Sequence, residues 1–114
     1  MRLACWNWGG RMHAGVVASD GREVTPRRGK PVEVQALWLN ALWIGSHQAG
    51  RFRKPFESGR HSFQHLFWNE AQGCLFDVVD VDHVPGDDDG TLRPSQVLAI
   101  GGLPVQLVGG ARAK

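Results

Sequence analysis

The amino-acid sequence predicts a mainly α-helical fold with one short β or extended segment. Three stretches support this prediction. Residues 31–43 are apolar on two opposite faces at a helical period, residues 54–68 are apolar on one face, and residues 96–100 form an apolar run shortly after a proline. With 114 residues, of which 42% are hydrophobic and 21% charged, the chain has the size and composition of one small globular domain.

The charge and cysteine content argue against several classes of function. A net charge of +2 is too small to indicate binding to nucleic acid or to an anionic membrane. The stretch 25–43 could span a bilayer by its length, but the polar residues within it, Glu33 among them, argue against a membrane helix. No secretory signal is recognisable, and Cys5 and Cys74 form no CxxC motif, so we expect free thiols and a cytoplasmic location.

The N-terminal segment, residues 1–19, has no clear period. Trp6 and Trp8 alternate with small or polar residues, as in a short strand. The Asp-Gly pair at Asp20 then predicts a turn. We therefore separate an irregular segment, 1–19, from a domain that covers residues 20–114.

The first helix is expected to begin at Pro31, because proline suits the first helical position, where its missing N–H is not needed. Its polar surface is narrow and consists of Glu33, Gln35 and Asn40. A helix that is apolar nearly all round is a buried helix, so we expect neighbours on both sides. The two apolar faces are Val34, Leu37, Trp38, Ala41 and Leu42 on one side, and Val32, Ala36, Leu39 and Trp43 on the other.

The second helix, residues 54–68, is one-sided and should lie on the outside of the fold. Residues 73–81 are rich in β-formers and predict a short strand or extended segment, and residues 82–92 predict a loop. A third helix is expected at 96–100, and the last four residues look like the first turn of another. The apolar face of the second helix consists of Phe56, Gly59, Phe63, Leu66 and Phe67.

Helix order predicts where the polar loops lie. Consecutive helices joined by short turns run antiparallel, so the first and third helices should point in the same direction. Their N-terminal loops, residues 27–30 and 82–93, should then lie on the same face of the molecule. The charged residues of both loops are therefore expected together.

Carboxylates gather on this predicted face. Glycoside hydrolysis requires paired carboxylates, because one protonates the leaving oxygen and the other activates water, with a separation of about 6.5–9.5 Å in inverting enzymes. Alternatively, the same acids form structural ion pairs with nearby arginines, and residue types alone favour this alternative. The acids are Glu33, Asp77, Asp80 and Asp82, and the arginines are Arg27, Arg28 and Arg93.

No metal site is predicted. The acidic run at 87–89 lacks the alternate spacing of a calcium loop and is expected to be a solvated turn. His61 and His65 have the spacing of zinc ligands on a helix, but Ser62 occupies the position where a metalloprotease needs glutamate, so we expect surface histidines.

Three tryptophans are candidate sugar platforms, because an aromatic face packs on the apolar face of a pyranose ring. Each of them could equally belong to the core. We assign Trp43 to the core and leave the orientation of the other two open. The three candidates are Trp38, Trp43 and Trp68.

Four motifs occur in a specific order along the chain. They are TPRRGKPVEVQALWLNAL at 25–42, FWN at 67–69, GCLFDVVD at 73–80 and RPSQVLAIGGLP at 93–104. Together they resemble the amylo-α-1,6-glucosidase domain of glycogen debranching enzymes of the bacterial and archaeal type. The resemblance covers roughly residues 20–108.

The resemblance implies a fold and an activity. The fold would be about two helical hairpins of an (α/α)6 six-hairpin barrel, with a pocket at the N-terminal ends of its inner helices. The activity would be hydrolysis, with inversion and without a cofactor, of the α-1,6-linked glucose left at the branch points of glycogen or a limit dextrin. The residues implied around the pocket are Arg27, Lys30, Glu33, Trp68, Asn69, Asp77, Asp80, Arg93 and Gln96.

The sequence also departs from the family pattern. Ser95 stands where the family has asparagine, and residues 13–20 replace the TWMD motif that carries the general acid. The YHQG-type segment near the second catalytic carboxylate does not occur. No catalytic residue can therefore be assigned, Asp20 included.

Three hypotheses follow from these departures. The chain could be a fragment of a debranching enzyme that is inactive alone, a non-catalytic glucan-binding or interaction fragment, or a subunit completed by another chain. Because two hairpins cannot cover a helix that is apolar on both sides, we also expect self-association through exposed apolar helix faces or a molten state.

Overall fold

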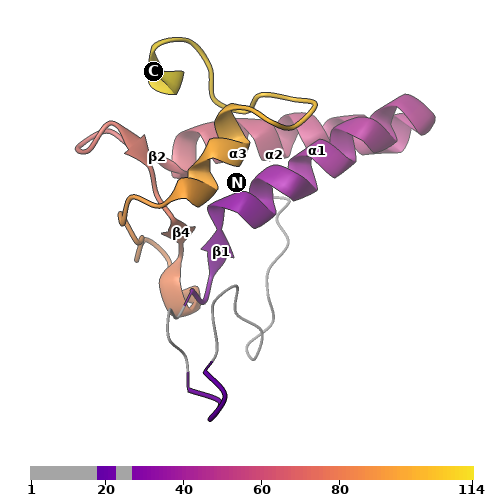
Figure 1. Cartoon of the computed structure of the whole chain (residues 1–114). Coiled ribbons are helices and arrows are strands. Elements are labelled where there is room, and N and C mark those ends of the chain that lie inside the picture. Colours follow the sequence, from indigo (N-terminus) through magenta and orange to yellow (C-terminus); the bar gives the residue numbers. More distant parts are fainter. Residues whose placement is uncertain (1–17, 23–26) are drawn as a thin grey trace.

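The structure of the chain is a computed structural model that describes residues 18–22 and 27–114. Trp6, Trp8 and Cys5 lie outside the described residues, and the turn predicted at Asp20 is present. A mainly α-helical fold with a small extended part is confirmed (Figure 1). The described part contains helices α1 (Val32–Gln48), α2 (Arg53–Leu66) and α3 (Val97–Ile100), and strands β1 (Lys30–Pro31), β2 (Trp68–Asn69), β3 (Cys74–Leu75) and β4 (Val78–Val79).

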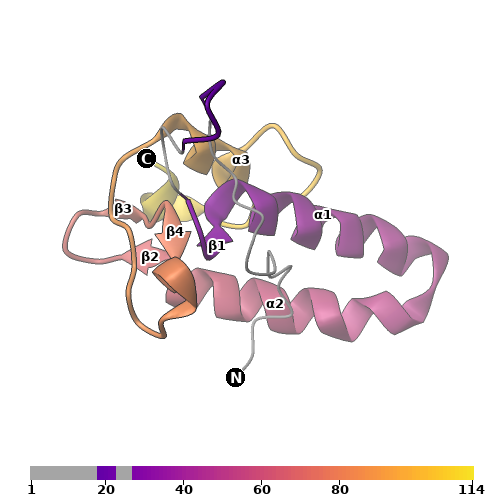
Figure 2. The same cartoon turned by 90° about the horizontal axis from the view of Figure 1, so that it is seen from below.

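Helices α1 and α2 form an antiparallel hairpin, joined by the 3-10 turn Gly50–Phe52 (Figures 1 and 2). The extended backbone of Pro31 precedes α1, so the predicted start is correct to within one residue. The α1–α2 contact forms about half of the core, and α3 packs onto α1 from the other end of the chain. The buried apolar side chains of the hairpin are Val32, Ala36, Leu39 and Leu42 from α1 and Phe56 and Phe63 from α2.

Only one side of α1 is buried, so the prediction of a helix buried nearly all round is wrong in part. The exposed fractions of Leu37 and Ile44 are 49% and 52%, and Ala41 between them is exposed too. These three residues are spaced i, i+4 and i+7, so they form one stripe, which we call the α1 stripe. Within the described part, α1 packs mainly against two helices, α2 and α3. Two neighbouring helices cannot cover all sides of a third, so the α1 stripe stays exposed.

Asn40 is buried, although we expected it on the polar surface of α1. Its side-chain amide donates to the carbonyl of Ala36 at 2.9 Å and to that of Val105 at 3.2 Å, and its Oδ1 accepts from the amide of Val105 at 2.7 Å. A buried amide is tolerated when its donors and acceptor are paired. Asn40 thereby anchors the segment after α3 to the central helix. Gln35, also assigned to the polar surface, is likewise buried.

Most of the apolar face of α2 is confirmed. Phe63 and Phe67 are fully buried and stack with their ring centroids 4.7 Å apart. Leu66 is 43% exposed, so its assignment to this face is wrong. Trp38 and Trp43 are partly buried and pack against the core.

Two short antiparallel ribbons complete the fold. Strand β1 pairs with β4, with Lys30 opposite Val79, and β2 pairs with β3. Val78 also forms a bridge to Asp89, so three segments lie side by side. The extended conformation predicted for 73–81 is confirmed by β3 and β4.

The pairing of β1 with β4 brings the predicted polar loops together. The amide of Asp82 donates to the carbonyl of Arg28 at 3.1 Å, and the amide of Val32 donates to the carbonyl of Asp77 at 2.9 Å. The prediction that loops 27–30 and 82–93 share one face is therefore confirmed.

Candidate functional site

The site is built around Arg27, which lies in the loop that leads into β1. Its Nε and Nη2 donate to Oδ2 and Oδ1 of Asp77 at 2.8 and 2.9 Å. Its Nη1 and Nη2 donate to Oε1 and Oε2 of Glu33, in the first turn of α1, at 2.5 and 2.6 Å. Burial alone would lower the pKa of Arg27, but the hydrogen bonds from Glu33 and Asp77 outweigh burial and hold this pKa above its ordinary value. One guanidinium therefore binds two carboxylates, and both oxygens of each carboxylate accept a hydrogen bond from it.

Asp77 is the centre of the charged cluster. Its side chain is 1% exposed and also accepts from Nη1 of Arg93. Arg93 lies 3.4 Å from Oδ2 of Asp89 as well. The backbone of Asp77 is fixed on both sides, because its carbonyl accepts from Val32 and its amide donates to the carbonyl of Asp89 at 2.8 Å. We call Arg27, Glu33, Asp77, Asp89 and Arg93 the charged cluster.

Lys30 and Asp80 form a neighbouring ion pair across the β1–β4 ribbon. Oδ1 of Asp80 also accepts from the amide of Gly86 at 3.1 Å. Burial would raise the pKa of Asp80, but the hydrogen bond from Lys30 and that from Gly86 lower it below its usual range. Arg28 and Asp82 are further apart, at 3.9 Å, and well exposed.

The lowered pKa values of Asp80 and Asp89 predict that the fold loses stability in acid. The pKa of Asp89 is also depressed, because hydrogen bonds from Thr91 and the charge of Arg93 outweigh its burial. A carboxylate with a depressed folded-state pKa contributes stability above its unfolded pKa, about 3.9, and loses it as the pH falls through the folded value. We expect the thermal midpoint to be steady near pH 7 and to fall progressively below about pH 4.

Thermal unfolding between pH 7 and pH 3, followed by circular dichroism, measures this effect. Asp80→Asn and Asp89→Asn should each flatten the acid limb of the profile, whereas Asp20→Asn, in an exposed turn, should not. If the acid limb were the same in the unmodified chain and in all three variants, Asp80 and Asp89 would not be the source of the acid sensitivity.

A second group of predicted site residues lies beside the charged cluster. Oδ1 of Asn69 accepts from the amide of Ala71 at 3.1 Å. Oε1 of Gln96 accepts from the amide of Leu75 at 3.3 Å, and its Nε2 donates to the carbonyl of Arg93 at 3.2 Å. Gln96 thus ties β3 to the charged cluster, and Asn69 shapes the β2–β3 turn.

Trp68 belongs to this second group. The guanidinium carbon of Arg112 lies 4.8 Å from its ring centroid, and Arg112 pairs with Glu70 at 2.8 Å. The indole N–H of Trp68 is buried and has no hydrogen-bond partner within the described part of the chain. The ring lines a cavity of about 200 Å³, together with Leu75 and Gln96.

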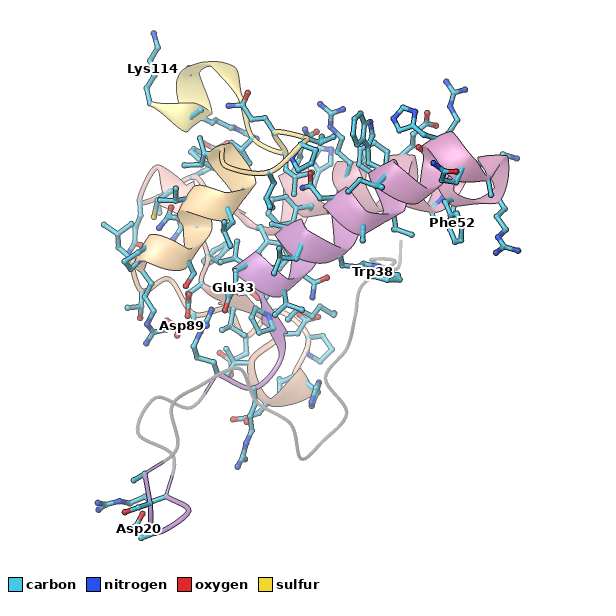
Figure 3. The ribbon with its side chains drawn as sticks, turned by 45° about the vertical axis from the view of Figure 1, so that its right-hand side comes forward. Asp20, Glu33, Trp38, Phe52, Asp89 and Lys114 are labelled. Atoms are coloured by element: carbon cyan, nitrogen blue, oxygen red, sulfur yellow. The ribbon has the colours of Figure 1, made fainter. Side chains whose placement is uncertain are left out.

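All nine residues predicted for the site lie near the same end of the α1–α2 hairpin. Figure 3 shows Glu33 and Asp89 close together there, with Phe52 at the opposite end. Asp89 is a member that sequence reasoning missed, because the acidic run around it has the composition of a solvated turn. Its i, i+4 spacing from Arg93 gives no signal, because residues so spaced are neighbours only on a helix and this stretch is a loop. No signal pointed to Arg112 either.

The cluster favours the ion-pair interpretation of these acids over the catalytic one. Asp77 is nearly inaccessible to water and binds two guanidinium groups, while Glu33, 18% exposed, uses both oxygens on Arg27. Every oxygen of these two carboxylates already accepts a hydrogen bond from an arginine, whereas a glycosidase base needs an oxygen available to activate water. Among the described residues, no group of three potential ligands could hold a metal ion, and no helix is long and apolar enough to cross a membrane.

Fold and site together define a mainly α-helical domain with an ion-paired polar site at the N-terminal end of its central helix. The chain belongs to the amylo-alpha-1,6-glucosidase family, whose model matches residues 2–113. This match confirms the resemblance and extends beyond the motifs that carry it. No curated protein and no solved structure is significantly similar to the chain.

Proposed function

We propose that this chain takes part in the hydrolysis of α-1,6-linked glucose at glycogen branch points, and that it shapes the glucan site without supplying the acid and the base. Membership of the family supports the reaction and the substrate class. We also propose that the α1–α2 hairpin, within a partial domain 20–114, is one of the hairpins of an (α/α)6 barrel. The polar site at the start of α1 is consistent with a pocket at the N-terminal ends of such helices.

The observation that carries the non-catalytic role is the bonding of Asp77 and Glu33. Both are occupied by Arg27, and Arg93 adds a further bond to Asp77. These bonds hold α1, β4 and the loop before α3 in one arrangement. Trp68, Asn69 and Gln96 are then positioned beside that scaffold, where an aromatic ring and amide groups suit a sugar.

Glucose release and glucan binding test this proposal. We expect the purified chain to release no glucose from a branched limit dextrin and to co-sediment with glycogen. Trp68→Ala should weaken binding by about two- to tenfold, since one stacking aromatic contributes roughly 0.5–1.5 kcal/mol and 1.4 kcal/mol is a factor of ten. Val84→Ala, which changes an exposed apolar residue outside the α1 stripe, is the matched control and should bind as the unmodified chain does.

Two outcomes would contradict the proposal. Steady glucose release that scales with the amount of chain would show that the acid and base are present after all. Failure to co-sediment with glycogen, in a preparation whose circular dichroism is helical, would remove the glucan-binding role.

We also propose that the chain self-associates through the α1 stripe. From Val34 to Gln48 the helix contains no Asp, Glu, Lys or Arg, so no like charges oppose contact between two copies. Leu37 and Ile44 expose apolar surface that association would bury. In sedimentation velocity, we expect the mean mass to rise with concentration, and Leu37→Glu with Ile44→Glu to restore a monomer.

The control for this experiment is Leu92→Glu, which changes a more exposed leucine on a loop and should leave association unchanged. A monomer at every concentration, with a sharp thermal transition, would be evidence against self-association.

A further inference from the structure

A second hollow lies at the other end of the α1–α2 hairpin, away from the charged cluster. It has a volume of about 360 Å³, within the usual range for small-molecule sites. Trp43 is about 15 Å from Glu33 along the helix axis, at 1.5 Å per residue. The hollow is lined by Trp43, Ser46 and His47 of α1 and by Arg53, Phe56 and Glu57 of α2.

Trp43 forms an aromatic wall of this hollow. We assigned Trp43 to the core, and it does pack against the core, but it is only partly buried and also faces the hollow. Its ring meets that of His47 edge to face, with centroids 4.4 Å apart and an interplanar angle of 84°. The indole is therefore oriented by its contact with His47 and by its packing against the core.

The rim of the hollow carries both a donor and an acceptor. Nε of Arg53 lies 3.2 Å from Oε1 of Glu57, and both side chains are mostly exposed, at 76% and 60%. Glu57 disfavours an anionic ligand and Arg53 a cationic one, while a purely apolar ligand would take water from these two charged groups without offering them hydrogen bonds. A neutral ligand with several hydroxyl groups fits, because each hydroxyl both donates and accepts hydrogen bonds.

We propose that this hollow is a second carbohydrate site, which binds a neutral oligosaccharide segment of an α-glucan with one sugar ring against Trp43. This inference rests on the proposed function, because the glucan is the neutral polyhydroxyl ligand that the family relates to the chain. The site would give a long glucan a second point of contact, so overall affinity would exceed that of either site alone.

The test uses maltoheptaose and the five indole N–H resonances of the chain in ¹H–¹⁵N NMR. Trp43→Phe and Trp68→Phe identify the two resonances by their disappearance. We expect the Trp43 resonance to shift and saturate with maltoheptaose. Arg53→Gln combined with Glu57→Gln should raise the dissociation constant read from that resonance at least fivefold, whereas Arg60→Gln, an exposed arginine of the same helix, should leave it unchanged.

The outcomes separate this inference from the proposed function. If the Trp68 resonance shifts and the Trp43 resonance does not, glucan binding stands and the second site is overturned. If neither resonance shifts, glucan binding itself fails and the second site fails with it. An unchanged dissociation constant in the Arg53 and Glu57 double variant would also overturn the inference, and circular dichroism of the variants checks that they fold.

Discussion

Replacing Arg27 by methionine is expected to lower the free energy of unfolding by about 3–5 kcal/mol. The substitution keeps most of the side-chain length but removes the guanidinium that binds Asp77 and Glu33. Asp77, at 1% exposure, would then keep a buried negative charge with only Arg93 to balance it. An uncompensated buried charge is costly because the protein interior solvates it poorly. Urea unfolding followed by circular dichroism measures the change.

Arg53→Met is the matched control for this prediction. Arg53 also pairs with a carboxylate, Glu57, but both side chains are mostly exposed, so the expected change is below about 1 kcal/mol. Arg27→Met combined with Asp77→Asn should recover part of the loss, because the buried charge is then removed with its partner. Equal losses for the Arg27 and Arg53 variants would refute the central role of Arg27.

Alanine at Gly29 is expected to destabilise the chain by about 2–5 kcal/mol. Gly29 has a φ of +131°, which residues with a side chain rarely adopt. An added Cβ would lie 2.6 Å from the carbonyl oxygen of Asp80 and 2.9 Å from that of Val79. Since both contacts are with backbone, relief requires β1 and β4 to separate. The Lys30–Asp80 pair would be disturbed with them. Thermal unfolding measures the loss.

Gly86→Ala separates the steric clash from the backbone conformation. Gly86 also has a positive φ, +80°, but an added Cβ there meets no atom within 4 Å. Its substitution should cost only the conformational strain, about 1–2 kcal/mol. If Gly29→Ala and Gly86→Ala cost the same, the close approach of β4 to Gly29 would not matter for stability.

Both substitutions test the same physical idea. Arg27 and Gly29 lie a few residues before α1, and each contacts a residue about fifty positions later in the chain, Asp77 and Asp80 respectively. The start of the central helix is therefore held by charge and close backbone packing, not by a side-chain cap, which Pro31 does not provide. Any glucan bound near Trp68 would meet a surface whose shape depends on these contacts.

The helices, their order and the face shared by the polar loops follow from the local sequence pattern. The helical spacing of apolar residues predicted the bounds of α1 and α2 to within a few residues, because a packed helix must keep its apolar side chains on the buried side. Because consecutive helices alternate in direction, the loop around Arg27 was predicted to lie beside the loop around Arg93. The order of motifs indicated the family, which the family match confirms.

Which residues pair, and which side of α1 is covered, depends on contacts between distant parts of the chain. Asp77 and Asp89 look alike in sequence, yet one is buried between two arginines and the other sits at the edge of the cluster. Asn40 is buried and Leu37 exposed, against their polarity, because Val105 supplies partners for the amide while the described elements pack around the opposite side of the helix. The residue type sets which hydrogen bonds or apolar contacts a side chain can make, whereas long-range contacts in the fold decide which partner lies beside it.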